Sequence, residues 1–217
     1  MKTVNKYSFH RWWKQAIKNP PQIYKDWIEK EENWLQKNIG KDTRVLDVGC
    51  GFGKDIKLLV NIAKNISGID YDWEAVKEAR KNLSQFRNVN ILLENARDMR
   101  FENNTFDYVI CMGNTFGNFG KDKLKILKEM KRVVKKKGKI IIGVYSERAL
   151  PTRINVYKKT KVKIKKINRN GTVIAAEGLI SEQFSKEKLK NIFKKTGLES
   201  KVTKLNSLSY ICEAVKK

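Results

Sequence analysis

Residues 45–53 read VLDVGCGFG, in which an apolar strand pattern runs directly into glycines at every second position. A short apolar run that ends in glycine predicts a strand buried within a sheet. Glycines let the backbone come close to a ligand because no side chain stands in the way. A helical pattern follows, so the stretch predicts a strand, a ligand-binding turn and a helix.

Three kinds of ligand site compete for such a turn. A dinucleotide-binding turn needs its third glycine at position 54, where this chain has Lys54. A phosphate-binding loop needs a longer spacing and a hydroxyl residue where this chain has Asp55. The remaining pattern is GxGxG preceded by Asp47, whose carboxylate disfavours a pyrophosphate and suits the ammonium group of a methionine moiety.

Apolar and amphipathic segments alternate through the middle of the chain. The expected strands are 43–48, 65–70, 88–93, 105–111 and 138–145, and the expected helices between them are 53–64, 73–85 and 119–136. Such alternation predicts a parallel sheet covered by helices on both faces. Ahead of it, residues 8–37 predict two helices, of which the second begins near Pro20 and Pro21.

The pattern changes after Tyr145. Two strand-like stretches, 158–168 and 172–180, meet at Asn170-Gly171. This dipeptide favours a tight primed hairpin turn because both residues tolerate positive φ. A helix and two antiparallel strands are expected to follow at 185–196, 199–205 and 208–215.

The composition narrows the class of protein. Lysine and arginine outnumber aspartate and glutamate by 47 to 23, an excess that suits a nucleic-acid partner and equally a lysine-rich or heat-adapted surface. The three cysteines, Cys50, Cys111 and Cys212, form no C-x-x-C pair, so neither a metal site nor a disulfide framework is expected. No apolar run is long enough to cross a membrane and residues 1–10 lack a secretory signal, which predicts a cytoplasmic protein.

Four stretches, in this order and spacing, resemble the class I S-adenosylmethionine-dependent methyltransferases. They are VLDVGCGFG at 45–53, GIDYDWEAVKEARKN at 68–82, NARDMRFENNTFDYVICMGNTFGNF at 95–119 and LKEMKRVVKKKGKIIIG at 127–143. The resemblance covers about residues 40–145 and implies an α/β fold with a three-layer, Rossmann-like, seven-stranded sheet. That sheet is mostly parallel and ends in an antiparallel C-terminal hairpin. We expect this domain over 41–217, with an inserted β-hairpin at about 158–181, and a helical lid or extension over 1–40.

The resemblance also implies S-adenosylmethionine as the cofactor and assigns residues to it. The glycine loop is expected to hold the methionine part, through Asp47, Gly49, Cys50, Gly51 and Gly53. Asp70, which closes the second strand, is expected to accept the ribose hydroxyls, whereas Asp72 is expected to cap the next helix.

The adenine is expected near the ends of the second, third and fourth strands. Tyr71 is expected either to stack on it or to pack in the core. Where the family commonly has Gly-Asp-Ala, this chain has Glu94, Asn95 and Ala96, so Asn95, with Asp98 as the alternative, is expected to read the adenine amino group. Cys111 ends the fourth strand and completes the expected cofactor contacts.

The methyl acceptor is expected where the fourth strand ends, at Cys111-Met-Gly-Asn-Thr-Phe116. This stretch resembles the Gly-Asn-Ser/Thr-Phe of methyltransferases that act on small amines or acids, and it lacks the Asn/Asp-Pro-Pro of many amide and adenine methyltransferases. Asn114 and Tyr145 are expected to position the acceptor, with Thr115 and Phe116 beside it. Capping of the next helix is the alternative role of Asn114 and Thr115.

The aromatic segment 7–13 is a candidate lid over the cofactor, with Arg11 near its carboxylate. Its alternative is a helix that packs Trp12 or Trp13 on the domain. His10, the single histidine, is a candidate substrate contact or a surface residue.

The hairpin is expected to overhang the acceptor and shape its choice. Its basic residues suit either an RNA backbone or an ordinary exposed strand face: Lys158, Lys159, Lys161, Lys163, Lys165, Lys166 and Arg169. The sequence thus favours an enzyme that methylates N or O of a small molecule by in-line displacement. An RNA or protein methyltransferase and a noncatalytic cofactor-binding module remain as alternatives.

Overall fold

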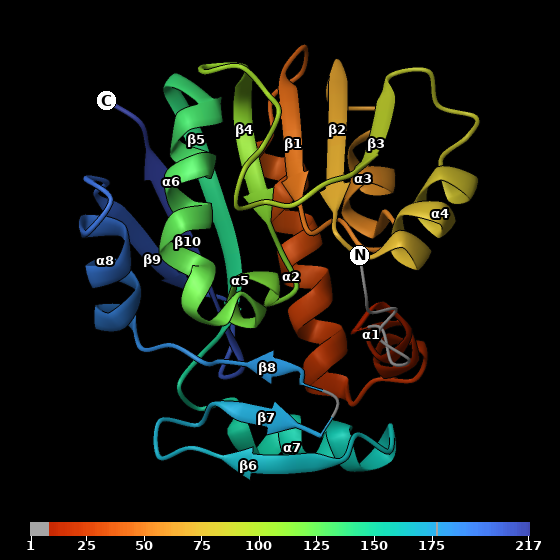
Figure 1. Cartoon of the computed structure of the whole chain (residues 1–217), viewed down its shortest axis with the longest axis vertical. Coiled ribbons are helices and arrows are strands. Elements are labelled where there is room, and N and C mark those ends of the chain that lie inside the picture. The colour runs from red at the N-terminus through yellow and green to blue at the C-terminus, as the bar shows by residue number, and fades with distance from the viewer. Residues whose placement is uncertain (1–8, 177) are drawn as a thin grey trace.

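The chain folds into a large mixed sheet with a smaller sheet beneath it (Figure 1). This computed structural model describes residues 9–176 and 178–217, with side chains from Trp12 onward. Within these ranges the main sheet has the order β3-β2-β1-β4-β5-β10-β9. Its strands are β1 Arg44–Val48, β2 Asn65–Asp70, β3 Val89–Leu93, β4 Phe106–Cys111, β5 Val134–Tyr145, β9 Ser200–Lys204 and β10 Ser209–Val215.

The first five strands are parallel, and β10 lies antiparallel between β5 and β9. This confirms the predicted Rossmann-like sheet with an antiparallel C-terminal hairpin. The fifth strand begins at Val134, earlier than expected, because the pairing of β4 with β5 shifts register between Phe106 and Tyr108.

Helices cover both faces of the main sheet, which gives three layers (Figure 1). They are α1 Phe9–Lys18, α2 Gln22–Asn38, α3 Lys54–Leu59, α4 Trp73–Asn82, α5 Thr115–Asn118, the 3₁₀ turn η1 Gly120–Asp122, α6 Lys123–Val133, α7 Leu150–Lys159 and α8 Lys186–Lys194. Apolar residues of α2, α3 and α4 form one core with one face of the sheet, and those of α6 and α8 form another with the opposite face. Burying both faces accounts for the continuous apolar runs of the central strands.

The segment after Tyr145 differs from the expected hairpin. Residues 150–159 form α7, which has Pro151 in its first turn. Proline is tolerated there because the N–H groups of the first turn have no partner within the helix. The strands are correspondingly short: β6 Ile164–Ile167, β7 Val173–Ala175 and β8 Ile180–Ser181. The turn is also longer than predicted, because only Gly171 has positive φ, while the Asn170 side chain accepts a hydrogen bond from the Thr172 N–H.

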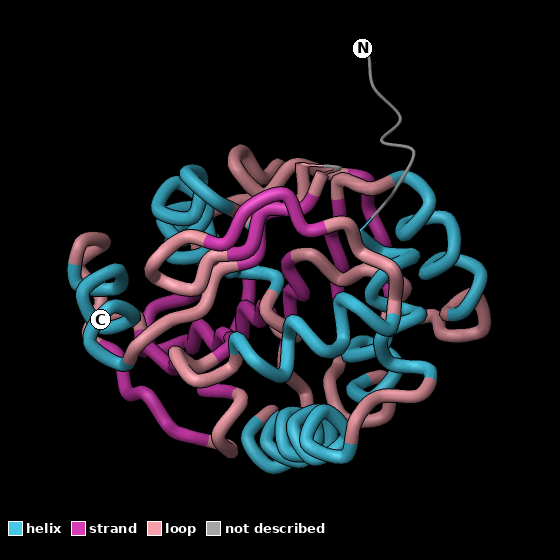
Figure 2. The backbone as a smooth tube through the Cα atoms, turned by 90° about the horizontal axis from the view of Figure 1, so that it is seen from below, coloured by secondary structure: helices cyan, strands magenta, loops and turns pink. Residues whose placement is uncertain are grey.

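The small sheet and α7 lie beyond the carboxyl ends of the parallel strands, as the view of that end in Figure 2 shows. Arg153 of α7 joins this unit to the rest of the protein. Its fully buried guanidinium donates to the Gly171 and Ser181 carbonyls and to the Gln183 side chain. It also lies 4.9 Å from the centre of the Tyr145 ring, a cation–π contact.

Replacing Arg153 with methionine is expected to lower the free energy of unfolding by about 3 kcal/mol, because buried acceptors lose their donor. In a chain of this size that corresponds to a drop in Tm of roughly 6–12 °C. Thermal unfolding followed by circular dichroism measures it. The exposed Arg148→Met is the control, and equal melting of the two variants contradicts a clamping role.

Candidate active site

The loop after β1 is folded back onto the end of β2. The N–H groups of Gly49 and Cys50 both donate to the Ile69 carbonyl, at 2.8 and 3.0 Å. Gly49 has φ of +77° and a Cβ there would lie 2.3 Å from Cγ2 of Thr115, so only glycine fits. Gly51 also has positive φ, but a Cβ there would meet no atom within 4 Å. The loop therefore presents bare backbone to open space at Gly51.

Asp70 ends β2 and is held in place by backbone N–H groups. Oδ2 accepts from the Gly51 N–H and Oδ1 accepts from the Asp72 N–H, each at 2.9 Å. These two donors fix the orientation of the carboxylate, whose oxygens can each accept more than one hydrogen bond, a property that suits hydroxyl groups. Asp72 caps α4 as predicted, accepting from the N–H groups of Glu74 and Ala75.

The residues expected at the adenine are mostly at the surface. Tyr71 is 76% exposed, so its ring is not part of the core. Asn95 is exposed, and its Oδ1 accepts from the backbone N–H and the Nε of Arg97. Ala96 packs against the core, and Asp98 is exposed. An adenine contact from Asn95 therefore has to share an oxygen that Arg97 already uses.

Asp47 is buried beside the glycine loop, 2% exposed, and its Oδ2 has no hydrogen-bond partner among the described residues. Burial raises its pKa well above the usual range, the Asp55 charge adds to the rise and Lys54 opposes it. Burial also raises the pKa of the Cys50 and Cys111 thiols, so both stay protonated at neutral pH. Because a buried oxygen without a partner is unfavourable, a cation or a hydrogen-bond donor beside Asp47 would stabilise it.

Asn114 and Tyr145 lie together, but their polar atoms bind protein neighbours. Oδ1 of Asn114 accepts from the Tyr145 N–H at 3.0 Å, and its Nδ2 donates to Oγ of Ser181. The Tyr145 hydroxyl shares a 2.8 Å hydrogen bond with the Tyr24 hydroxyl, and burial raises the pKa of Tyr145 well above its usual value. Asn114 thus joins β4, β5 and β8, and its side chain forms no cap of α5.

Thr115 and Phe116 follow in α5. Thr115 is half-buried and packs against the glycine loop at Gly49. Phe116 is fully buried between Phe119 and Phe184, so its ring packs in the core instead of lining an acceptor site.

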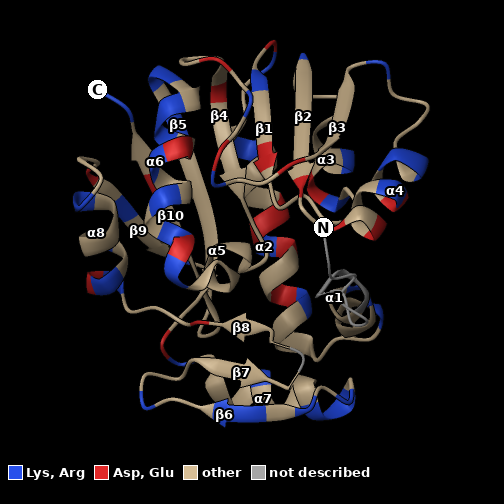
Figure 3. Ribbon diagram, in the orientation of Figure 1, with Lys and Arg blue, Asp and Glu red and all other residues tan. Residues whose placement is uncertain are grey.

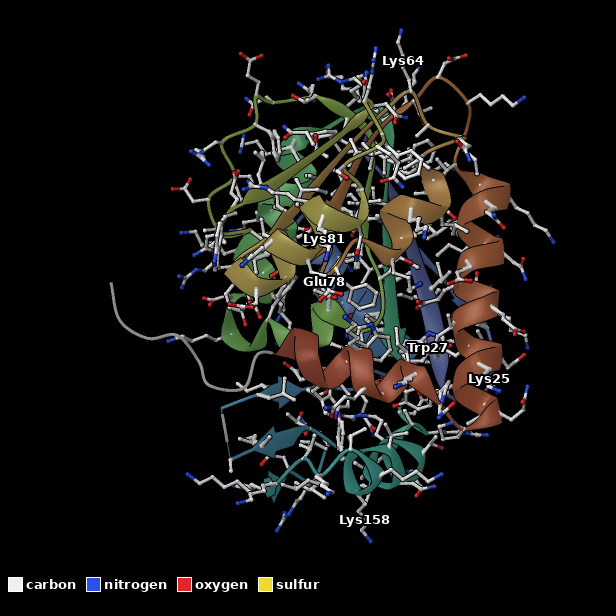
Figure 4. The ribbon with its side chains drawn as sticks, turned by 90° about the vertical axis from the view of Figure 1, so that its right-hand side faces the viewer. Lys25, Trp27, Lys64, Glu78, Lys81 and Lys158 are labelled. Atoms are coloured by element: carbon white, nitrogen blue, oxygen red, sulfur yellow. The ribbon has the colours of Figure 1, made fainter. Side chains whose placement is uncertain are left out.

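Helix α1 crosses the carboxyl end of the sheet, below the labelled Glu78 and beside Trp27 in Figure 4. The Trp12 indole donates to Oγ1 of Thr160 at the end of α7, and Lys14 forms an ion pair with Glu78 of α4. The helix therefore spans from α7 to α4. The side chains of His10 and Arg11 lie outside the described residues.

Comparison with known proteins decides the family. A family model described as a methyltransferase domain matches residues 39–197. The chain belongs to this methyltransferase family. S-adenosylmethionine is the methyl donor that the family uses.

Similar curated methyltransferases include the demethylmenaquinone methyltransferases of Staphylococcus aureus strains JH9 and Newman. They are 30% identical over 138 residues, which are 60% of this chain and 56% of theirs. The chain thus spans about half the length of the curated relatives it matches.

Among solved structures, a protein of Pyrococcus horikoshii is 27% identical with a TM-score of 0.73, covering 91% of this chain and 92% of its own. A methyltransferase of Aquifex aeolicus shares the fold at 18% identity and a TM-score of 0.70, covering 98% of this chain and 100% of its own.

The site residues of this methyltransferase fit the cofactor chemically. The unsatisfied Asp47 oxygen suits an ammonium group, the oriented Asp70 carboxylate suits paired hydroxyls, and the exposed Tyr71 ring suits a base. Among the described residues, no group of three or more His, Cys, Asp or Glu side chains could hold a metal ion. Nor does any described helix combine the length and apolar character needed to cross a membrane.

Sequence reasoning missed one acidic residue of this methyltransferase, Glu31 on α2. It is 2% exposed, and its Oε2 accepts from the Gly113 N–H at 3.3 Å, just beyond β4. Burial raises its pKa to about 7, the Asp55 charge adds to the rise and Lys54 opposes it. The available signal was an acid within the apolar stripe of α2, formed by Tyr24, Trp27, Glu31 and Leu35.

Replacing Asp70 with asparagine is expected to weaken binding of S-adenosylhomocysteine by roughly 10- to 100-fold, because charged hydrogen bonds to the ribose are lost. Isothermal titration calorimetry measures the change. Asp72→Asn is the matched control, since asparagine caps a helix as well as aspartate does. Equal affinity of the Asp70 variant and the wild type contradicts the ribose role.

Proposed function

We propose that the chain transfers a methyl group from S-adenosylmethionine to a nucleophilic nitrogen or oxygen of a small molecule. The observation that carries the proposal is the bare Gly51 backbone, tied to Asp70 beside the unsatisfied Asp47 carboxylate. In this proposal the glycine loop and Asp47 hold the methionine part of the cofactor. Asp70 binds the ribose, and Tyr71 and Asn95 contact the adenine. The remaining residues assigned to the cofactor line its site without a specific polar role: Gly49, Cys50, Gly53, Ala96 and Cys111.

When bound, the cofactor supplies a methyl group whose bond to sulfur breaks as the bond to the acceptor forms, with the electron pair left on sulfur. Such a displacement needs orientation and exclusion of water more than a charged catalyst. Helix α1 supplies the cover in this proposal, with Trp12 anchored on Thr160 and Trp13 lying 5.8 Å from Trp27, centroid to centroid. Arg11 on the same helix is assigned to the cofactor carboxylate and His10 to the acceptor.

The acceptor is assigned to the region between the end of β4 and the small sheet. Asn114 and Tyr145 act there as positioning residues, since Asn114 holds β4, β5 and β8 together. Thr115 lies next to the loop. The names of the relatives agree with a small acceptor: demethylmenaquinone methyltransferase, and a Burkholderia thailandensis didemethyltoxoflavin methyltransferase that shares the fold with a TM-score of 0.68.

RNA is the second candidate acceptor, because basic residues gather at the outer edge of the small sheet and the end of α7 (Figure 3). The exposed ones are Lys158, Lys159, Lys161, Lys163, Lys165, Lys166 and Arg169. They lie at the same end of the molecule as the carboxyl ends of the parallel strands. Binding through such residues is electrostatic and weakens steeply with salt.

Incubating the protein with methyl-labelled S-adenosylmethionine and cell extract tests both candidates. Small-molecule methylation predicts label in the low-mass fraction, and a lower initial rate of labelling there with Asp70→Asn. Label confined to RNA or protein contradicts the small-molecule proposal. Cofactor binding without release of S-adenosylhomocysteine from any acceptor pool indicates a noncatalytic module instead.

A triple variant with Lys163, Lys165 and Lys166 changed to glutamate separates the two acceptors further. Since these side chains are exposed on β6 or, for Lys163, just before it, the variant is expected to keep the wild-type rate of small-molecule labelling and the wild-type Tm. Initial rates measure this at two salt concentrations. If the variant labels much more slowly, and high salt slows the wild type to a similar extent, the result supports RNA as the acceptor.

A further inference from the structure

Glu31 projects from α2 onto the sheet where β4 and β5 approach their carboxyl ends. Its Oε2 is bonded to the Gly113 N–H, while its Oε1 forms no hydrogen bond of good geometry among the described residues. The neutral indole of Trp27 lies close enough to lower the pKa of Glu31. A Cβ on Gly143 of β5 would lie 2.1 Å from that Oε1. The carboxylate therefore occupies the space that glycine leaves on β5, and it is 2% exposed.

No described cation satisfies this buried carboxylate. Lys54 is the nearby candidate, but its ammonium is bonded to Asp55 at 2.6 Å and to Glu32 at 3.1 Å. Although burial lowers the pKa of Lys54, those two acids raise it above its usual value, so it stays charged and committed to them. Only neutral donors, the Gly113 N–H and the Trp27 indole, act on Glu31 beside Lys54. A buried charge without its own counter-charge is costly, which favours a ligand cation as the counter-charge of Glu31.

Glu31 and Asp47 share the same surroundings. The charges of Lys54 and Asp55 act on both carboxylates. Both carboxylates also raise the pKa of the Cys111 thiol, after burial itself. Each keeps one oxygen without a partner among the described residues. Both acids thus act on the last residue of β4, Glu31 from α2 and Asp47 from β1.

We propose that Glu31 and Asp47 together hold the ammonium group of the methionine part of S-adenosylmethionine, with Glu31 the residue that couples cofactor binding to pH. The inference rests on the proposed function. A single ammonium has three donors, which suits two carboxylate oxygens and one further acceptor. Helix α2 lies before the region that the family model matches, so this contact belongs to the chain's N-terminal extension.

The coupling to pH has a definite sign. In the free protein burial raises the pKa of Glu31 to about 7, so the carboxyl is about half protonated at neutral pH. A bound cation favours the charged form, so binding at pH 7 releases a proton and affinity increases as pH rises through 7. Of the titratable groups that act on Glu31 or respond to it, Lys54 stays charged, while Cys111 keeps its proton. Asp55 is paired with Lys54, which leaves Asp47 as the other group that responds to the ligand.

Titration calorimetry of the full chain with S-adenosylhomocysteine, in two buffers of different ionisation enthalpy, tests the proposal. For Glu31→Gln we expect roughly 10- to 100-fold weaker binding at pH 8 and less proton release at pH 7 than in the wild type. The exposed Glu29→Gln on the same helix is the matched control and should behave as the wild type. Binding of 5′-methylthioadenosine, which has no amino-acid part, should be the same in all three proteins.

Folding is checked on the same samples. Removing a buried carboxylate whose pKa is raised should increase the Tm of the free protein at pH 8, and the gain should shrink by pH 5. A Glu31→Gln protein that melts above the wild type yet binds S-adenosylhomocysteine weakly supports the ligand role.

Two results overturn the inference. One is unchanged affinity of Glu31→Gln for S-adenosylhomocysteine, which assigns Glu31 to the acceptor or to packing. The other is proton uptake on binding, which places the cofactor carboxylate beside Glu31. Neither result contradicts the proposed function. A wild-type protein that binds neither S-adenosylhomocysteine nor 5′-methylthioadenosine contradicts the proposed function itself.

Discussion

The hydrogen bond from the Gly51 N–H to the Asp70 carboxylate is the contact on which the candidate site depends. It joins the loop after β1 to the end of β2, and the bonds from Gly49 and Cys50 to the Ile69 carbonyl reinforce it. Because β1 and β2 are adjacent parallel strands, their carboxyl ends meet at one edge. One strand thus supplies bare backbone, and its neighbour supplies an oriented carboxylate.

The second constraint on the site is the burial of two carboxyl groups. Asp47 and Glu31 are buried with one oxygen each unsatisfied among the described residues, and burial raises the pKa of both. In a free protein this arrangement works against stability, since apolar side chains of the same size would pack there at lower cost. Functional sites commonly carry such conflicts, which a ligand of opposite charge relieves. Lys54, the cation that acts on both acids, does not relieve them, because it is already paired with Asp55 and Glu32.

The parts that surround the site come from outside the central βαβ units. Helices α1 and α2 precede the region matched by the family model, and they contribute Trp12, Trp13 and Glu31. Arg153 holds α7 and the small sheet against Tyr145. The proposed cofactor contacts thus lie mainly at the carboxyl ends of the strands, with Glu31 added from α2, whereas the proposed cover comes from α1.

The sequence by itself determined the sheet, because each of its elements has its own period, cap or turn: the Asp72 cap of α4 and the antiparallel β9–β10 pair are local features. It also pointed to the glycine loop and Asp70, which occur in one short stretch. Only the tertiary structure decided α7 in place of a long strand, the bonding of Asn114 and Tyr145 to protein partners, and the burial of Glu31. Those outcomes depend on contacts between residues far apart in the chain, such as Glu31 with Gly113. The apolar stripe of α2 places Glu31 on the buried face, but no local pattern specifies which residues it meets there.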